Sequence, residues 1–211
     1  KAAVYTHYGS PDVIQLTQVE KPTPKDNELL IRIGASTVTP TDCAYRRANP
    51  FIIRFVQGLL KPKSTVLGNL LVGEVEAVGK DVSSFKPGDS VLGTADTGFG
   101  AHAEYICLPQ TGIITTSPAN MTCEEAVGIP EALTPLYFLR DLARVQPGQK
   151  VLINGASGAL GTYGVQLARY FGAEVTGVCS TANVDLVKSL GADHVIDYTK
   201  TDFTRTSETY D

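Results

Sequence analysis

The stretch Val151-Leu-Ile-Asn-Gly-Ala-Ser-Gly-Ala-Leu-Gly161 decides the fold of this chain. It begins with an apolar run that is typical of a buried strand and continues into a glycine-rich turn. Beyond the turn, Leu160, Gly164 and Leu167 recur at helical spacing, which predicts a helix with one face on a sheet. We expect this helix to begin near Gly158.

The turn also predicts a nucleotide site. Ala156-Ser-Gly-Ala-Leu-Gly161 follows the G-x-G-x-x-G pattern, with alanine in the first glycine position. Gly158 would let the backbone approach a pyrophosphate, and Gly161 would let the helix pack closely on the strand. The helix N-terminus would offer N–H groups to the anion. A second strand, Ala173 to Cys179, lies where a βαβ dinucleotide-binding unit requires it.

The type of dinucleotide can be argued from charge. An NAD site places an acidic residue at the end of the second strand, about 20 residues after the glycines. No acidic residue lies between Val175 and Val184, where the run Cys179-Ser-Thr-Ala-Asn183 offers hydroxyl groups and an amide. This predicts NADPH as the cofactor and makes NADH the weaker candidate. No Arg or Lys lies in this run either, and Lys188 is a distant candidate.

Composition excludes several other classes of protein. The 211 residues are 43% hydrophobic, enough for a core, and carry a net charge of −4, which argues against a nucleic-acid binder. No apolar run reaches the roughly 20 residues of a membrane-spanning helix. The four cysteines are widely separated, which predicts free thiols in a reducing cytoplasm. The three histidines stand apart from them, so we expect no metal site.

The chain divides into two parts by its pattern of elements. Short strands punctuated by glycine and proline, such as Glu28 to Gly34 and Val72 to Gly79, predict a small β-barrel in the first part. From Thr122 to Arg144 good helix formers dominate, with Thr122 and Glu125 as a capping box, and we expect Pro130 and Pro135 to interrupt or restart the helix. Strands and helices alternate afterwards, as in a parallel sheet. We therefore expect an α/β protein with domains at residues 1–120 and 121–211.

The order of motifs along the whole chain resembles the medium-chain dehydrogenase/reductase superfamily, on its zinc-free, quinone-oxidoreductase-like side. The resemblance is carried by Ala2-Ala-Val-Tyr5, Gly9-Ser-Pro-Asp-Val13, Gly73-Glu-Val-Glu-Ala-Val-Gly79, Phe85-Lys-Pro-Gly-Asp89, Gly100-Ala-His-Ala-Glu-Tyr105, Gly155-Ala-Ser-Gly-Ala-Leu-Gly161 and Leu190-Gly-Ala-Asp-His-Val-Ile-Asp-Tyr198. It implies a GroES-like barrel, then a Rossmann domain, with the active site between them.

The same resemblance bears on zinc. Zinc-dependent relatives carry Cys-His-x-Asp where this chain has Thr39-Pro-Thr-Asp42, and Gly-His-Glu where it has Gly68-Asn-Leu70. The four-cysteine structural zinc loop is also missing. The resemblance therefore implies an enzyme without zinc.

The resemblance also assigns candidate site residues. Thr39 and Thr134 would face the nicotinamide end of the cofactor. Ser157, Gly158, Ala159 and Leu160 would contact the pyrophosphate, and Ser180, Thr181 and Tyr198 would surround the 2′-phosphate. Relatives often carry Arg or Lys near Ala182 and Asn183, and this chain does not.

The implied reaction is hydride transfer from NADPH to a quinone, an enone or another carbonyl compound. Without a metal, the developing oxyanion would need solvent or hydrogen-bond donors, and Thr41 and Tyr45 are the candidate donors. The apolar segment Phe51 to Leu60 either lines a substrate entrance, which suggests a small hydrophobic substrate, or is a short helix buried on its own lobe. The main alternative function is an NADP(H)-binding redox sensor or interaction module without turnover. A further alternative is a zinc-free alcohol-dehydrogenase-like or acyl-reductase-like branch.

The length of the chain predicts an incomplete dinucleotide-binding domain. A doubly wound dinucleotide domain has two halves, and the motifs reach only the end of the first, at Val195 to Asp197. We therefore expect a Rossmann sheet that is truncated after its first half. Family members commonly dimerise through the later strands, so the complete protein is expected to be a homo-oligomer.

Overall fold

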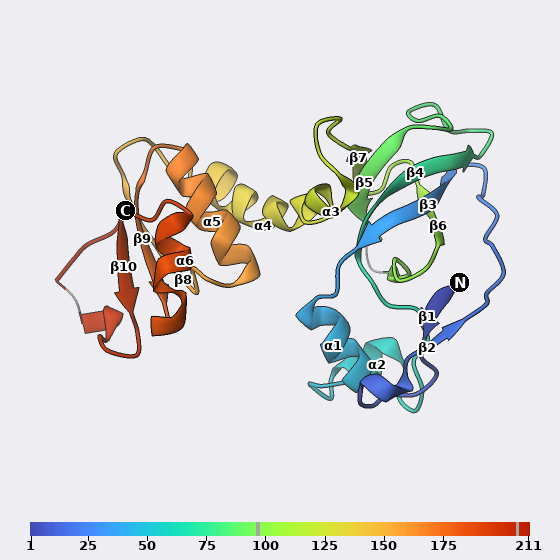
Figure 1. Cartoon of the computed structure of the whole chain (residues 1–211), viewed down its shortest axis with the longest axis horizontal. Coiled ribbons are helices and arrows are strands. Elements are labelled where there is room, and N and C mark those ends of the chain that lie inside the picture. The colour runs from blue at the N-terminus through green and yellow to red at the C-terminus, as the bar shows by residue number, and fades with distance from the viewer. Residues whose placement is uncertain (96–97, 206) are drawn as a thin grey trace. The chain divides into compact units, whose positions relative to one another are not determined.

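The computed structural model describes residues 1–95, 98–205 and 207–211 and divides into two units, Lys1–Pro130 and Glu131–Asp211 (Figure 1). The division lies ten residues after the expected boundary. Helix α3 (Cys123–Ala126) packs on strands β3 and β4, so it belongs with the first unit. In the described residues, no helix has the length and apolar character needed to cross a membrane.

The first unit is built on an antiparallel sheet of five strands in the order β6-β3-β4-β5-β7 (Figure 1). The strands are β3 (Glu28–Ser36), β4 (Leu70–Val78), β5 (Ser90–Thr94), β6 (Tyr105–Pro109) and β7 (Ile114–Thr116). Alternating side chains such as Leu29, Ile31 and Val75 point into its core. Strands β1 (Ala2–Val4) and β2 (Gln15–Thr17) form a small second sheet. The expected strand-rich GroES-like lobe is confirmed.

Two short helices follow strand β3 in the first unit. Helix α1 (Pro40–Arg47) begins at a capping box in which Thr39 is the N-cap and Asp42 the third helical residue. Helix α2 (Ile53–Gln57) buries only Ile53 and Gln57. The large apolar residues around these two are 55–86% exposed, namely Phe51, Ile52, Phe55, Val56, Leu59 and Leu60. The alternative that this segment is a helix buried on its own lobe is therefore wrong.

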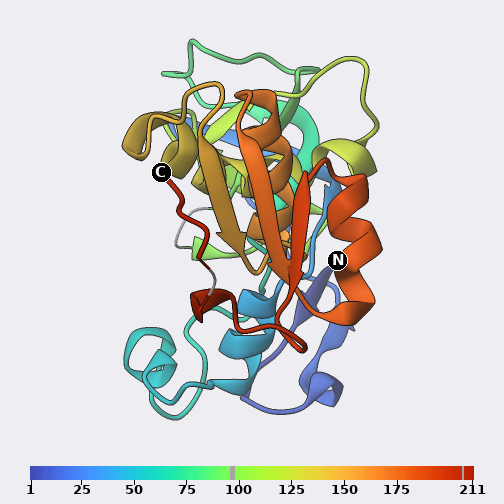
Figure 2. The same ribbon diagram turned by 90° about the vertical axis from the view of Figure 1, so that its left-hand side faces the viewer.

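The second unit contains a parallel sheet in the order β10-β9-β8, formed by β8 (Lys150–Asn154), β9 (Glu174–Cys179) and β10 (His194–Asp197) (Figure 2). Helix α5 (Ala159–Tyr170) connects β8 to β9, and helix α6 (Val184–Ser189) connects β9 to β10. Val165, Val175 and Val187 are fully buried where these helices meet the sheet. The predicted βαβαβ half of a dinucleotide-binding fold is confirmed.

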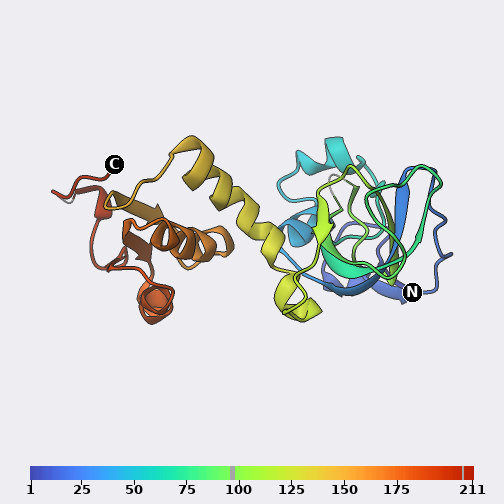
Figure 3. The ribbon, with the colours of Figure 1, turned by 90° about the horizontal axis from the view of Figure 1, so that it is seen from above.

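The helical run from Thr122 to Arg144 is broken into shorter pieces, as its prolines predict. Helix α3 has the predicted Thr122–Glu125 capping box, and a 3-10 turn (Ile129–Ala132) that contains Pro130 follows it. Helix α4 (Leu133–Leu136) then continues into a π-helix (Tyr137–Leu142), and the two form one coil in Figure 3. Proline lacks the backbone N–H that a continuous α-helix would need, which accounts for the break at Pro130.

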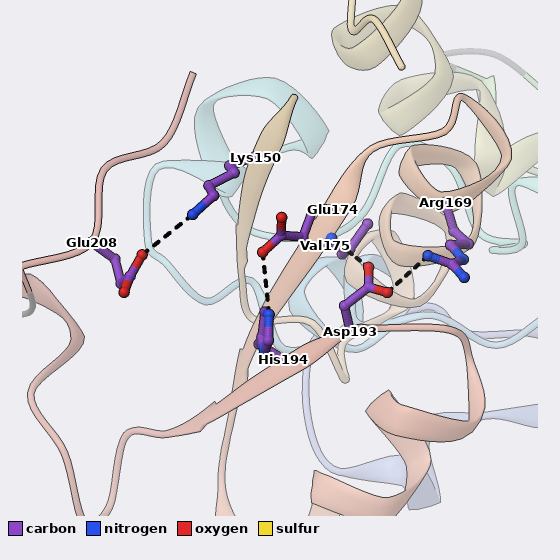
Figure 4. A network of polar contacts seen from close by, with 7 residues as sticks. All are labelled: Lys150, Arg169, Glu174, Val175, Asp193, His194 and Glu208. Atoms are coloured by element: carbon purple, nitrogen blue, oxygen red, sulfur yellow. Dashed lines mark hydrogen bonds and ion pairs between the residues drawn. The ribbon is translucent and has the colours of Figure 1, made fainter. Parts of the chain in front are cut away.

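Polar contacts tie the helices and strands of the second unit together at one end of its sheet (Figure 4). Asp193 accepts hydrogen bonds from the Arg169 side chain and from the Val175 N–H, both at 2.8 Å. His194 and Glu174 lie 3.2 Å apart on neighbouring strands. Asp193 therefore links helix α5 to strand β9.

Strand β8 is an edge strand, paired with β9 on one side. On its other side, the N–H of Asp211 donates to the carbonyl oxygen of Lys150 at 3.0 Å. The Lys150 N–H donates to the Asp211 carboxylate at 2.8 Å. The edge along Val151 to Ile153 has no partner strand among the described residues.

Candidate cofactor site

The turn between β8 and α5 requires glycine at specific positions. Gly155 has φ +75°, in the left-handed region that favours glycine. A Cβ atom on Gly161 would lie 2.1 Å from the Gly155 carbonyl oxygen and 2.8 Å from the Ala156 Cα. Ala156 donates its N–H to the Val178 carbonyl oxygen at 2.9 Å, which fixes the turn on β9. The helix therefore begins as close to the strand as the glycine pattern predicts.

The N-terminus of helix α5 is suited to an anion. Gly158 is the extended N-cap residue, and no side chain caps the helix. The N–H groups of the first helical turn lack intrahelical partners and carry partial positive charge. Gly158, Ala159 and Leu160 are exposed at this point. A pyrophosphate group fits this backbone cradle.

A cavity of about 290 Å³ lies beside the turn within the second unit. Thr134, Phe138, Ile153 and Leu160 are among its mostly apolar lining residues. The structure thus brings Thr134 next to the glycine turn, although it lies 23 positions before Ser157 in the sequence.

The residues expected around the ribose lie where β9 and β10 end. Ser157 and Ser180 are linked by the Asn183 side-chain amide, which donates to their hydroxyl oxygens at 3.1 and 3.3 Å. Tyr198 donates its N–H to the Cys179 carbonyl oxygen at 3.1 Å, and its side chain is exposed.

The lack of acidic residues between Val175 and Val184 does not leave this loop without a neighbouring carboxylate. No acidic residue lies between Val175 and Val184, but β10 brings the Asp197 carboxylate to this loop. The Thr181 hydroxyl donates to Asp197 Oδ2 at 2.5 Å. A carboxylate is therefore present at the expected ribose position, supplied by the neighbouring strand.

Thr39 lies in the first unit, where Asp42 fixes its hydroxyl group. Asp42 Oδ2 accepts hydrogen bonds from the Thr39 N–H at 2.7 Å and from the Thr39 hydroxyl at 2.8 Å. Asp42 Oδ1 accepts from the Gly68 N–H at 2.9 Å. Because its hydrogen is used by Asp42, the Thr39 hydroxyl can offer a ligand only an oxygen lone pair.

Thr41 and Tyr45 lie one turn apart on α1, so they share a face of the helix. Thr41 is exposed. The Tyr45 ring packs against Phe99 with their centroids 4.6 Å apart. Both hydroxyl groups are thus carried by one short helix of the first unit.

The positions where zinc-dependent relatives have cysteine and histidine hold Thr39 and Asn69. These residues offer neither a thiolate nor an imidazole, so the donor set does not fit zinc. His102, which lies nearby, has its Nε2 atom 3.0 Å from the Thr37 carbonyl oxygen. Within the described part of the chain, no group of three or more His, Cys, Asp and Glu residues could hold a metal ion.

The structure therefore gathers Thr134, Ser157, Gly158, Ala159, Leu160, Ser180, Thr181 and Tyr198 in the second unit, and Thr39, Thr41 and Tyr45 in the first. Sequence reasoning missed two organising residues, Asp42 and Asp197. The Thr39–Asp42 capping-box spacing could have revealed Asp42. Asp197 makes its contact with Thr181 through strand pairing, which no local pattern shows.

Comparison with known protein families gives two matches in the same order as the units. The alcohol dehydrogenase GroES-like domain matches residues 25–119. The zinc-binding dehydrogenase domain matches residues 159–209.

Curated relatives align over most of this chain but over little more than half of their own length. A trans-enoyl reductase of Aspergillus terreus is 36% identical over 83% of this chain and 50% of its own length. A 2-methylene-furan-3-one reductase of Solanum lycopersicum is 35% identical over 100% of this chain and 55% of its own length. A chloroplastic quinone-oxidoreductase homolog of Spinacia oleracea is 35% identical over 93% of this chain and 60% of its own length. The chain thus spans about half the length of the curated relatives it matches.

Solved structures agree with these relatives. The quinone oxidoreductase of Coxiella burnetii superposes with a TM-score of 0.87 at 28% identity, over 99% of this chain and 65% of that one. The quinone oxidoreductase of Escherichia coli, solved in complex with NADPH, gives a TM-score of 0.80 at 26% identity, over 95% and 59%. With both domains present in this order, the chain belongs to the medium-chain dehydrogenase/reductase superfamily, and its relatives there include quinone oxidoreductases and enoyl reductases.

Proposed function

We propose that this chain carries the cofactor-binding and substrate-binding parts of an oxidoreductase that reduces a quinone, enone or other carbonyl compound with NADPH and without zinc. The observation that carries the proposal is the cradle at α5, where only glycine fits at position 161 and the helix N-terminus is uncapped. The relative solved with NADPH has the same fold over this region.

The residues of the second unit would hold and orient the dinucleotide. The first-turn N–H groups of α5 would bind its pyrophosphate, together with the Ser157 hydroxyl that Asn183 positions. Thr134 and Leu160 would border the nicotinamide side of the turn, in the apolar cavity beside it. When bound, the nicotinamide supplies the hydride.

The residues of the first unit would bind the substrate and stabilise negative charge on its oxygen. Thr41 and Tyr45 can each donate a hydroxyl hydrogen bond from the same face of α1. Thr39 can only accept one, because Asp42 takes its hydrogen. We therefore assign Thr41 and Tyr45 to the oxyanion, and Thr39 to a ligand group that carries hydrogen.

The substrate class follows from the exposed segment that precedes and includes α2. Phe51 and Phe55 present two aromatic rings in an edge-on pair with centroids 5.8 Å apart. These rings and the aliphatic residues beside them suit a small hydrophobic compound. We also propose a reducing compartment such as the cytoplasm for the protein, because its four cysteines are free, and a homo-oligomer as its assembled form.

The test compares two variants at the N-cap of α5 in the full-length protein. Asp and Asn are both good N-cap residues, and either would place a Cβ 3.3 Å from the Gly155 carbonyl oxygen. Only aspartate adds negative charge beside the pyrophosphate. We expect Gly158→Asp to weaken NADPH binding at least about tenfold relative to Gly158→Asn, measured by fluorescence titration.

Turnover is then followed by NADPH oxidation with quinones and enones. Wild-type affinity and turnover in Gly158→Asp would contradict the proposed cradle. NADPH binding without oxidation across a broad panel of acceptors would favour the sensor function.

A further inference from the structure

Asp197, the last residue of β10, reaches across to the loop that follows β9. Its Oδ2 atom accepts the Thr181 hydroxyl hydrogen at 2.5 Å. Its Oδ1 atom accepts the Thr199 N–H at 3.0 Å and the Thr199 hydroxyl hydrogen at 2.7 Å. Asp197 pairs with Cys179 in the parallel register, so the carboxylate lies at the end of the second strand of the fold. Dinucleotide-binding folds place the adenosine ribose at this point.

The carboxylate is charged at neutral pH. The hydrogen bonds from Thr181 and Thr199 hold the pKa of Asp197 well below its usual range. The Lys200 ammonium group lies 3.3 Å from Oδ2 and is largely exposed. Because Val175 to Val184 contain no charged side chain, the Asp197–Lys200 pair supplies the fixed charge where β9 and β10 end.

This arrangement treats two kinds of ribose differently. A 2′-phosphate is repelled by the carboxylate, whereas an uncharged 2′-hydroxyl group is not. The Thr181 hydroxyl cannot donate to a phosphate while Asp197 holds its hydrogen. The Lys200 charge would be shared between Asp197 and a phosphate bound beside it, so Lys200 offsets the repulsion in part.

We propose that Asp197 is a specificity-determining residue of the cofactor site. Its carboxylate weakens the binding of the 2′-phosphate and so reduces the preference for NADPH over NADH. Lys200 offsets this effect. The inference rests on the proposed function, because it concerns the same dinucleotide.

The chain contains a matched control for Asp197. The sequences Asp197-Tyr-Thr-Lys200 and Asp202-Phe-Thr-Arg205 have the same order of an aspartate, an aromatic residue, a threonine and a basic residue. Asp202 Oδ1 accepts the Thr204 N–H at 3.0 Å and the Thr204 hydroxyl hydrogen at 2.6 Å, and Arg205 lies 3.2 Å from Oδ2. The local contacts are alike, but the contact with the loop after β9 belongs to Asp197.

The experiment titrates the full-length protein with NADPH and with NADH by fluorescence or calorimetry. We expect Asp197→Asn to tighten NADPH binding about tenfold, or 1.4 kcal/mol, and to change NADH binding far less or weaken it. Asp202→Asn should leave both dissociation constants unchanged. Lys200→Gln should weaken NADPH binding severalfold and leave NADH binding nearly unchanged.

The ratio of the two dissociation constants separates specificity from structure. If Asp197→Asn leaves the ratio of the two dissociation constants unchanged, the inference is overturned while the proposed function stands. If Asp197→Asn does not fold, Lys200→Gln decides, and an equal effect on both cofactors overturns the inference. Failure of the wild-type protein to bind either dinucleotide overturns the proposed function and the inference together.

Discussion

The Asp42 carboxylate accepts a hydrogen bond from the backbone N–H of Gly68 at 2.9 Å, across 26 residues of sequence. The same carboxylate holds the N–H and hydroxyl of Thr39. One buried side chain thereby joins the start of α1 to the segment that leads into β4.

Replacing this carboxylate should destabilise the first unit. Asp42→Asn keeps the shape, but its amide nitrogen must face either Gly68 or Thr39, both of which donate hydrogen. We expect the free energy of unfolding to fall by about 1–3 kcal/mol, measured by urea denaturation. Asp89→Asn, in a surface turn where the carboxylate accepts the Lys86 N–H, should cost less than about 1 kcal/mol. Equal losses in the two variants would contradict this role for Asp42.

Two glycines near the start of α5 should respond oppositely to alanine. A Cβ at Gly161 would lie 2.1 Å from a backbone oxygen, whereas a Cβ at Gly164 would meet Ile153 at an ordinary 3.4 Å. We expect Gly161→Ala to destabilise the second unit by about 2 kcal/mol or more. Gly164→Ala should be neutral or should stabilise it by up to about 1 kcal/mol. Thermal unfolding of both variants provides the check, and a tolerated Gly161→Ala would be the contrary result.

Alkaline stability should depend on Tyr5. Burial raises the pKa of its phenol above the ordinary value of 10.0. The folded state therefore holds this proton more tightly than the unfolded chain does. The resulting stabilisation is complete below pH 10 and is lost as the pH rises above it. We expect Tyr5→Phe to flatten the decline in unfolding midpoint above pH 10, unlike Tyr170→Phe at an exposed site. Parallel declines in Tyr5→Phe and wild type would count against this explanation.

The α2 segment should tolerate the loss of an aromatic residue better than the loss of an amide. The Gln57 side chain is buried and donates to the Ser64 carbonyl oxygen at 3.0 Å, whereas Phe55 is 68% exposed. Gln57→Ala should lower the free energy of unfolding by about 1–3 kcal/mol, and Phe55→Ala by less than about 0.5 kcal/mol. Chemical denaturation distinguishes them, and a larger loss for Phe55→Ala would reverse our account of how α2 is anchored.

Local patterns in the sequence predicted most of the fold. Alternation gave β4, and the glycine spacing gave the start of α5 to within one residue. The capping box at Thr122 was also visible. The break at Pro130 was predicted as well, whereas no pattern indicated the π-helix from Tyr137 to Leu142. The exposure of Phe51 and Phe55 was equally hidden, since an apolar run has the same composition whether it is covered or not.

The candidate site was predictable only where it depends on neighbouring residues. The turn from Ser157 to Gly161 has a local geometric requirement, so its pattern identified it. The contact between Thr181 and Asp197 depends on the pairing of β9 with β10, so the residues next to the second strand do not reveal it. Contacts that depend on the pairing of strands are the hardest to predict from a single sequence.

The open edge of β8 has a practical consequence for anyone who produces these 211 residues alone. Val151, Leu152 and Ile153 form a β-prone apolar run whose outer backbone groups have no partner strand among the described residues. Such an edge is a template for strand addition from another molecule. The isolated polypeptide should therefore self-associate through β8 as its concentration rises, and its handling calls for dilute, cold conditions or a fusion partner that shields this strand.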